Sequence, residues 1–237
     1  MSPAAGVLTG EPTDGQRAAE ASVSDRAGPG GGLVPVTTLI VTAHPDPDSL
    51  TLEVARRLQE ALPPGTATIA DLAAEGFDPR FTLADRHTYR TGEDAPEDVV
   101  REQRRLDGAT DLVLVFPVWW WSMPAVLKGW IDRVFVNGWA FDVDPERGIV
   151  RKLGALTTHL VPIAGDDAGV YDRHGYELAL RTQVEHGIVD YCGSRRGATA
   201  FVYESEQDDD AARERAVAAA VDSVRRAVEQ GRTAPPS

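Results

Sequence analysis

Cysteine is almost absent from this chain: Cys192 is the single thiol among 237 residues. One thiol excludes an internal disulfide and a cysteine-rich metal site. A chain without disulfides fits the reducing cytoplasm. We therefore expect a cytoplasmic protein in which Cys192 is a small buried apolar residue rather than a reactive group.

Long apolar runs and excess positive charge are also missing. No stretch approaches the roughly 20 apolar residues of a membrane span, and the N-terminal sequence MSPAAGVLTGEPTDG lacks the basic and apolar parts of a secretory signal. The 24 Lys and Arg residues are outnumbered by 37 Asp and Glu residues, which gives a net charge of −13. This balance argues against non-specific binding of nucleic acid and against binding to an anionic membrane surface.

The composition indicates one folded domain with two tails. Residues 1–34 are rich in Gly, Ala, Ser and Pro and poor in large apolar residues, which predicts a disordered extension. Residues 35–230 are long enough for one α/β domain with a substantial core. Residues 231–237 read GRTAPPS, which predicts a loose C-terminal tail.

The segment from Leu112 to Asp142 organises the domain. It opens with the apolar run LVLVF, which is typical of a strand buried on both faces of a parallel sheet. A turn with three consecutive tryptophans follows, and then apolar residues recur with helical spacing. Ser122 is a candidate N-cap of this helix, and Pro124 suits its first turn.

The three tryptophans lie where open α/β sheets bind ligands, beyond the carboxyl end of a strand. Three large flat side chains and the nearby backbone N–H groups suit a planar heterocycle. A place in the core or in a protein interface is the alternative. Adjacent side chains cannot all point into one core, so we favour a ligand or an interface.

A second candidate site follows the first expected strand, Val36–Thr42. Its turn contains two prolines, and Ser49 or Asp48 then caps a helix. The first N–H groups of a helix and the helix dipole attract anions. His44, Ser49 and Thr51 add further donors, so the turn is a candidate phosphate site. A simple capped turn is the equal alternative, because GxGxxG and GxxxxGK[ST] are both absent.

The remaining pattern completes an alternation of strands and helices. We expect strands at 67–70, 152–165 and 198–203, helices at 95–107, 176–191 and from 208 onward, and an irregular segment at 71–92. The residues Trp139–Phe141 are expected in a loop near the site, and Tyr171, His174 and Gly175 in another loop. Ala164 and Gly165 end the fourth strand, where small residues admit a ligand. The pattern predicts a three-layer flavodoxin-like fold with a parallel sheet of order 2-1-3-4-5.

Two stretches carry a resemblance to a known family. LIVTAHPDPDSLTLEVARRL and FPVWWWSMPAVLKGWIDRVFVNGWAF resemble the NAD(P)H:quinone oxidoreductases of the DT-diaphorase type, which are flavoproteins. The resemblance implies that the first turn binds the flavin phosphates, that the tryptophan turn lines the isoalloxazine ring, and that the strand end meets its pyrimidine edge. It also implies that a Tyr and a His stabilise the reduced flavin. The corresponding residues are His44, Ser49, Leu50 and Thr51; Pro117, Val118, Trp119, Trp120 and Trp121; Ala164 and Gly165; and Tyr171 with His174.

The resemblance further implies two-electron hydride transfer from NADH or NADPH, through bound FAD or FMN, to a quinone or similar aromatic acceptor. It implies a homodimer with the site shared across the interface. Two alternatives stay open. One keeps the flavin and changes the acceptor to an azo or nitro compound, and the other is an ancillary regulatory subunit of a potassium efflux transporter.

Overall fold

The computed structural model describes residues 37–233. The extension expected at 1–34 lies outside the described residues, and so do residues 234–237 of the expected tail. The last helix, α7, covers Asp210–Thr233 and thus includes residues 231–233.

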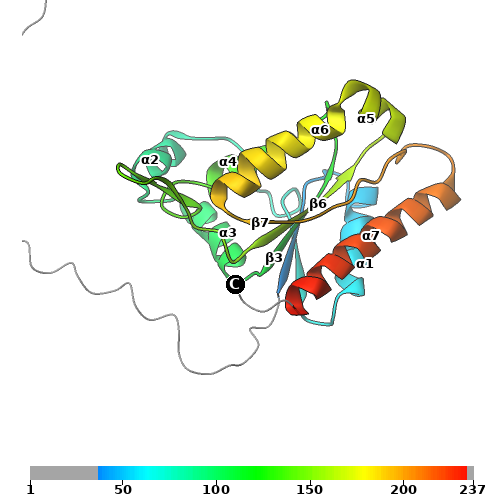
Figure 1. Ribbon diagram of the computed structural model, residues 1–237, viewed down its shortest axis with the longest axis horizontal. Helices are drawn as coiled ribbons and strands as arrows, with labels where there is room; N and C mark the ends of the chain where they lie inside the picture. Colours follow the sequence, from blue (N-terminus) through cyan, green and yellow to red (C-terminus); the bar gives the residue numbers. More distant parts are fainter. Residues whose placement is uncertain (1–36, 234–237) are drawn as a thin grey trace, which may run out of the picture. The chain divides into compact units, whose positions relative to one another are not determined.

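Five parallel strands form the central sheet in the order β2-β1-β3-β6-β7 (Figure 1). They are β1 (Thr38–Thr42), β2 (Ala67–Asp71), β3 (Asp111–Pro117), β6 (Thr157–Ile163) and β7 (Arg195–Thr199). The expected flavodoxin-like α/β fold with a five-stranded parallel sheet is confirmed. The expected strand numbering 2-1-3-4-5 is not confirmed. Two short strands that were not predicted come between β3 and β6 in the chain, so the order reads 2-1-3-6-7.

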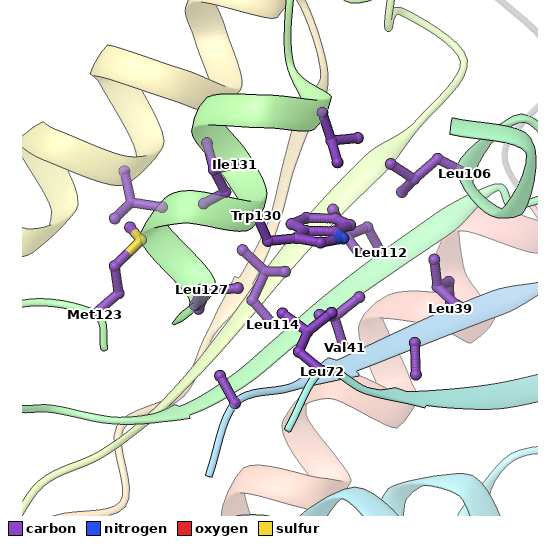
Figure 2. Packing of buried hydrophobic residues seen from close by; sticks show 14 of the residues in the cluster. Leu39, Val41, Leu72, Leu106, Leu112, Leu114, Met123, Leu127, Trp130 and Ile131 are labelled. Atoms are coloured by element: carbon purple, nitrogen blue, oxygen red, sulfur yellow. The ribbon is translucent and has the colours of Figure 1, made fainter. Parts of the chain in front are cut away.

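Alternate residues of the strands face two separate cores, which is why the strands read as continuous apolar runs. Leu39, Leu112 and Leu114 pack on one side with Leu127 and Trp130 of α4 (Ala125–Val134), as Figure 2 shows. The opposite face of the sheet packs against α1 (Leu50–Ala61) and α7. Its buried residues include Ile40, Val113, Val161, Leu58 and Val224. Helices therefore cover both faces of the sheet, and α1 and α7 share one side of it (Figure 1).

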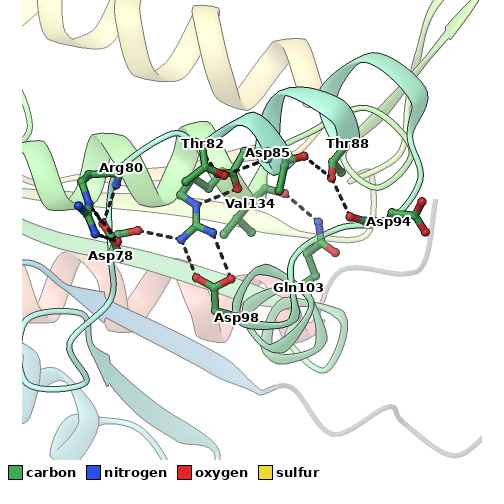
Figure 3. Close-up of polar contacts among 11 residues, drawn as sticks. Asp78, Arg80, Thr82, Asp85, Thr88, Asp94, Asp98, Gln103 and Val134 are labelled. Atoms are coloured by element: carbon green, nitrogen blue, oxygen red, sulfur yellow. Dashed lines mark hydrogen bonds and ion pairs between the residues drawn. The ribbon is translucent and has the colours of Figure 1, made fainter.

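The segment expected to be irregular contains a helix, α2 (Leu83–Thr91), ahead of α3 (Glu97–Asp107). This expectation was wrong because the helix buries polar rather than apolar groups. Asp85 completes a capping box with Thr82 and accepts a hydrogen bond at 2.9 Å from Nε of Arg133, which lies on α4. The same guanidinium also holds Asp98 at 2.6 Å (Figure 3). A buried charge is stable only when it is paired in this way, and the pairing fixes α2 onto α3 and α4.

The missed strands form an antiparallel hairpin, β4 (Phe141–Asp144) and β5 (Gly148–Arg151). Phe141 is therefore not in a loop. Trp139 also does not lie near the candidate site, because its Nε1 donates to Asp107. Asp107 ends the helix that leads into the amino end of β3, whereas the candidate site follows the carboxyl ends of the strands.

The region after β6 is more helical than expected. Tyr171 and His174 lie on a short helix, α5 (Ala168–His174), and not in a loop; Gly175 is its C-cap. The helix expected at 176–191 is present, but it divides into α6 (Tyr176–Arg181) and a π-helical segment, η1 (Thr182–Asp190). Cys192 is buried, as expected, and so is His159. Among residues 37–233, no helix is long and apolar enough to cross a membrane.

Candidate flavin site

Three turns meet at the carboxyl edge of the sheet. They follow β1, β3 and β6, whose ends lie side by side because the strands are parallel and in register. Ring contacts join the turns directly: His44 after β1 lies 5.8 Å from Trp119 after β3, between ring centroids. Trp121 lies 5.8 Å from Tyr171, which follows β6. The structure thus brings together the parts that the sequence analysis assigned to one site.

The turn after β1 leads into a capped helix N-terminus with free amide groups in the described part of the chain. Ser49 is the N-cap of α1, and its Oγ accepts the amide of Leu52 at 3.4 Å. His44 Nδ1 accepts the amide of Asp46 at 3.0 Å, which fixes the imidazole at the turn. Within residues 37–233, the backbone N–H groups of Leu50 and Thr51 have no hydrogen-bond partner. These orphan donors at a helix N-terminus suit the phosphate group of a flavin.

The tryptophan turn has an unusual backbone. Trp120 and Trp121 have φ of 49° and 62°, which places both in the left-handed region that non-glycine residues seldom adopt. Reciprocal backbone hydrogen bonds of 3.0 and 3.2 Å between Trp119 and Ser122 close the turn. Two adjacent residues at positive φ define the tight turn type that usually demands Asn and Gly.

This backbone spreads the three indoles in different directions. Trp120 is 93% exposed at the tip, and Trp119 is 46% exposed against His44. Trp121 turns inward and stacks on Tyr176, with ring centroids 3.8 Å apart and planes at 12°. The turn therefore offers two flat surfaces to a ligand and uses the third indole as an anchor.

Ser122 closes the turn and does not cap the helix, contrary to the expectation. Its Oγ donates to Oε1 of Gln183 at 2.7 Å, while Pro124 occupies the N-cap position of α4 without a side-chain hydrogen bond. Pro117 is the last residue of β3. The amide of Val118 donates to the carbonyl of Ile163 at 2.8 Å. In the part of the chain that the structure describes, the amides of Trp120 and Trp121 remain free to reach a polar ring edge.

Tyr171 and His174 lie in different surroundings, although they share α5. Tyr171 is only 2% exposed and has the rings of Trp121, Tyr176 and Tyr203 around it. Burial, with the nearby Asp166 carboxylate, raises the pKa of Tyr171 to about 12. His174 is exposed and stacks on Tyr176 at 5.1 Å. His174 is thus the member of the pair that is open to solvent.

The end of β6 has one residue tied to the sheet and one at the surface. The amide of Ala164 donates to the carbonyl of Val202 at 2.8 Å. Gly165 is exposed, and a Cβ at this position would lie 3.3 Å from the carboxyl carbon of Glu206. Gly165 thus keeps space between the strand end and Glu206, as a closely approaching ligand requires.

The polar residues beside the aromatic cluster were not predicted from the sequence. Tyr203 donates to Glu177 at 2.7 Å, and Arg181 donates to the other oxygen of that carboxylate at 2.7 Å. Burial alone would raise the pKa of Glu177, but these two hydrogen bonds outweigh it and hold the pKa below its ordinary value. A pocket of about 450 Å³ is lined by Glu177 and Arg181 together with Tyr171 and Leu178. The i, i+4 spacing of Glu177 and Arg181 is the sequence pattern that could have predicted this ion pair.

Comparison with known proteins agrees with this geometry. A family model described as flavodoxin-like fold matches residues 36–226. Ribosyldihydronicotinamide dehydrogenase (quinone) of Rattus norvegicus is 31% identical over 178 residues, which cover 65% of this chain and 76% of that protein. An uncharacterized NAD(P)H oxidoreductase of Escherichia coli K12 is 33% identical over 167 residues, covering 69% and 81%. The solved structure of an NAD(P)H:quinone oxidoreductase from Methanothermobacter marburgensis has a TM-score of 0.71 at 25% identity and covers 80% of this chain and 98% of its own.

Proposed function

This chain belongs to the flavodoxin-like family of NAD(P)H:quinone oxidoreductases, and from that membership we propose that it is a flavin-dependent NAD(P)H dehydrogenase acting on quinones. The observation that carries the proposal is the meeting of three turns at one edge of the sheet. The turn at residues 43–51 (hereafter the phosphate turn), the flat aromatic surface of the tryptophan turn and the small residues that end β6 adjoin one another there. A flavin needs these three features, for its phosphate, its ring and its polar ring edge.

The flavin, when bound, supplies the two-electron chemistry that links oxidation of the nicotinamide to reduction of the acceptor. The residues of this chain bind and orient it. His44, Ser49, Leu50 and Thr51 hold the phosphate, the latter two through backbone N–H groups. Pro117 and Val118 set the position of the turn, Trp119 and Trp120 line the ring, and Ala164 and Gly165 border its pyrimidine edge.

The two residues on α5 have separate parts in the proposal. His174 holds and moves a proton at its ring nitrogen and stabilises negative charge near the pyrimidine edge. Tyr171 keeps its proton at neutral pH, because burial holds its pKa near 12, and it positions Trp121. The exposed indole of Trp120 suits a homodimer in which a second copy completes the wall of the site.

Spectroscopy of the purified protein tests this proposal first. We expect flavin absorbance bands, and chromatography after acid release identifies the flavin; we propose FAD, with FMN as the alternative. Addition of NADH or NADPH is expected to bleach the bands, and a benzoquinone or naphthoquinone to restore them. A protein that stays colourless after incubation with both flavins contradicts the proposal and favours the transporter-subunit alternative. Bleaching that only azo or nitro compounds reverse moves the acceptor to that class.

A further inference from the structure

The phosphate turn carries acidic residues but no cation of its own. Between Ala43 and Ala55 the sequence contains Asp46, Asp48 and Glu53 and neither lysine nor arginine. Asp46 and Asp48 are exposed beside the free amides of α1. Two carboxylates in this turn would repel a phosphate bound to the same turn. A positive charge from outside the turn is therefore needed to balance them.

Arg56, in the second turn of α1, is the arginine that contacts this turn. Its Nη2 donates to the carbonyl of Pro47 at 2.8 Å, in the middle of the phosphate turn. Arg56 stands seven residues after Ser49 and hence on the same face of the helix. Helical side chains lean toward the N-terminus, so this long side chain extends back over the first turn of α1.

The remaining donors of Arg56 are unused. A guanidinium has five N–H donors, and within residues 37–233 the contact with Pro47 is the one hydrogen bond of this side chain, which forms no ion pair there. The neighbouring Arg57 differs in this respect. Its guanidinium is taken up by Glu53 and Glu214, each at 2.6 Å. Two adjacent arginines thus point to different places. Arg56, which is exposed, faces the turn and has no ion-pair partner among the described residues.

We propose that Arg56 is the cation of the phosphate turn. One N–H group holds the Pro47 carbonyl, and a second donates to the phosphate of the bound flavin, while its charge offsets Asp46 and Asp48. Arg56 thereby makes the site selective for phosphorylated flavins over riboflavin. This inference rests on the proposed flavin-binding function and assigns a further residue to the same site.

The test compares flavins with and without phosphate. The dissociation constants of FMN, FAD and riboflavin are measured for the flavin-free protein by quenching of flavin fluorescence. The variants are Arg56→Gln and Arg56→Lys, with Arg57→Gln as the matched control on the same helix. We expect Arg56→Gln to weaken binding of the phosphorylated flavin by about tenfold or more, as loss of a charged hydrogen bond does, and to leave riboflavin binding within about twofold, since riboflavin has no phosphate.

The control and the lysine variant sharpen the outcome. Arg57→Gln is expected to bind all three flavins as the unaltered chain does. Arg56→Lys is expected to be intermediate, because an ammonium keeps the charge but loses the planar fork of donors. Equal weakening of riboflavin and of the phosphorylated flavins, or equal effects of the Gln variants at both arginines, overturns the assignment. Failure of the unaltered chain to bind any flavin instead overturns the proposed function.

Discussion

The backbone of the tryptophan turn makes a sharp prediction about stability. Trp120 has a φ of 49°, and its side chain is almost fully exposed, so truncation removes little packing. Replacement by glycine removes both the indole and the steric cost of the left-handed conformation. Replacement by alanine removes the indole but keeps a Cβ, and with it the steric cost. The difference between the two variants therefore isolates the strain.

The expected magnitude follows from two opposing terms. A Cβ in the left-handed region costs about 1–2 kcal/mol, whereas glycine loses about 0.5–1 kcal/mol more backbone entropy on folding than alanine does. We expect Trp120→Gly to be more stable than Trp120→Ala by about 0.5–1 kcal/mol in the free energy of unfolding. At a residue with ordinary negative φ, the alanine variant would instead be the more stable of the two.

Urea denaturation of the two flavin-free variants measures this difference, and thermal unfolding checks it. A difference of about 1 kcal/mol corresponds to about 2–4 °C in Tm for a domain of this size. Both variants lose the indole, so both are expected to bind flavin and acceptor more weakly than the unaltered chain and to an equal extent. If the alanine variant is as stable as the glycine variant, or more so, the turn does not hold the strained conformation and the reasoning is refuted.

Four further predictions concern buried ionisable groups. Arg133→Gln removes the cationic partner of the buried Asp85 carboxylate and is expected to lower the free energy of unfolding by about 3–5 kcal/mol. The control Arg80→Gln breaks an exposed pair and is expected to have a far smaller effect in the same denaturation assay. Burial opposes ionisation of Asp85, but hydrogen bonds from Thr82 and Arg133 prevail and lower its pKa. The ionised Asp85 carboxylate therefore stabilises the fold above its ordinary pKa of 3.8, and this contribution is lost as the pH falls through the folded pKa. Asp85→Asn is expected to remove this acid dependence of the free energy of unfolding. The phenol of Tyr171 has a folded pKa of about 12, above its ordinary value of 10.0, so its contribution to stability is complete below pH 10.0 and is lost as pH rises toward 12; phenolate absorbance of Tyr171→Phe against the unaltered chain checks this step. Burial raises the pKa of the Cys192 thiol to about 11, so a thiol reagent at neutral pH is expected to react with it only after unfolding, and rapid reaction of the folded chain contradicts that expectation.

Local sequence patterns were sufficient for the elements that carry the site. The strand runs of β1 and β3 are apolar on both faces because both faces are buried. Ser49 caps α1 through its own side chain, a contact that spans three residues. Such features depend on neighbours in the chain, so composition and spacing were enough to find them, and the family resemblance added the chemistry.

Contacts between distant residues decided the features that the sequence analysis missed or misplaced. Helix α2 is polar on its inner face, and its stability depends on Arg133, which stands 48 residues after Asp85. The stack of Trp121 on Tyr176 joins the tryptophan turn to the start of α6, 55 residues later in the chain, while Trp120 stays exposed. The sequence by itself determined the parallel sheet, the capped phosphate turn and the place of the aromatic turn, because each depends on local periodicity and capping. Only the tertiary structure decided which indole anchors the turn, which rings surround Tyr171 and where the guanidinium of Arg56 points, because those depend on packing between elements that no local pattern encodes.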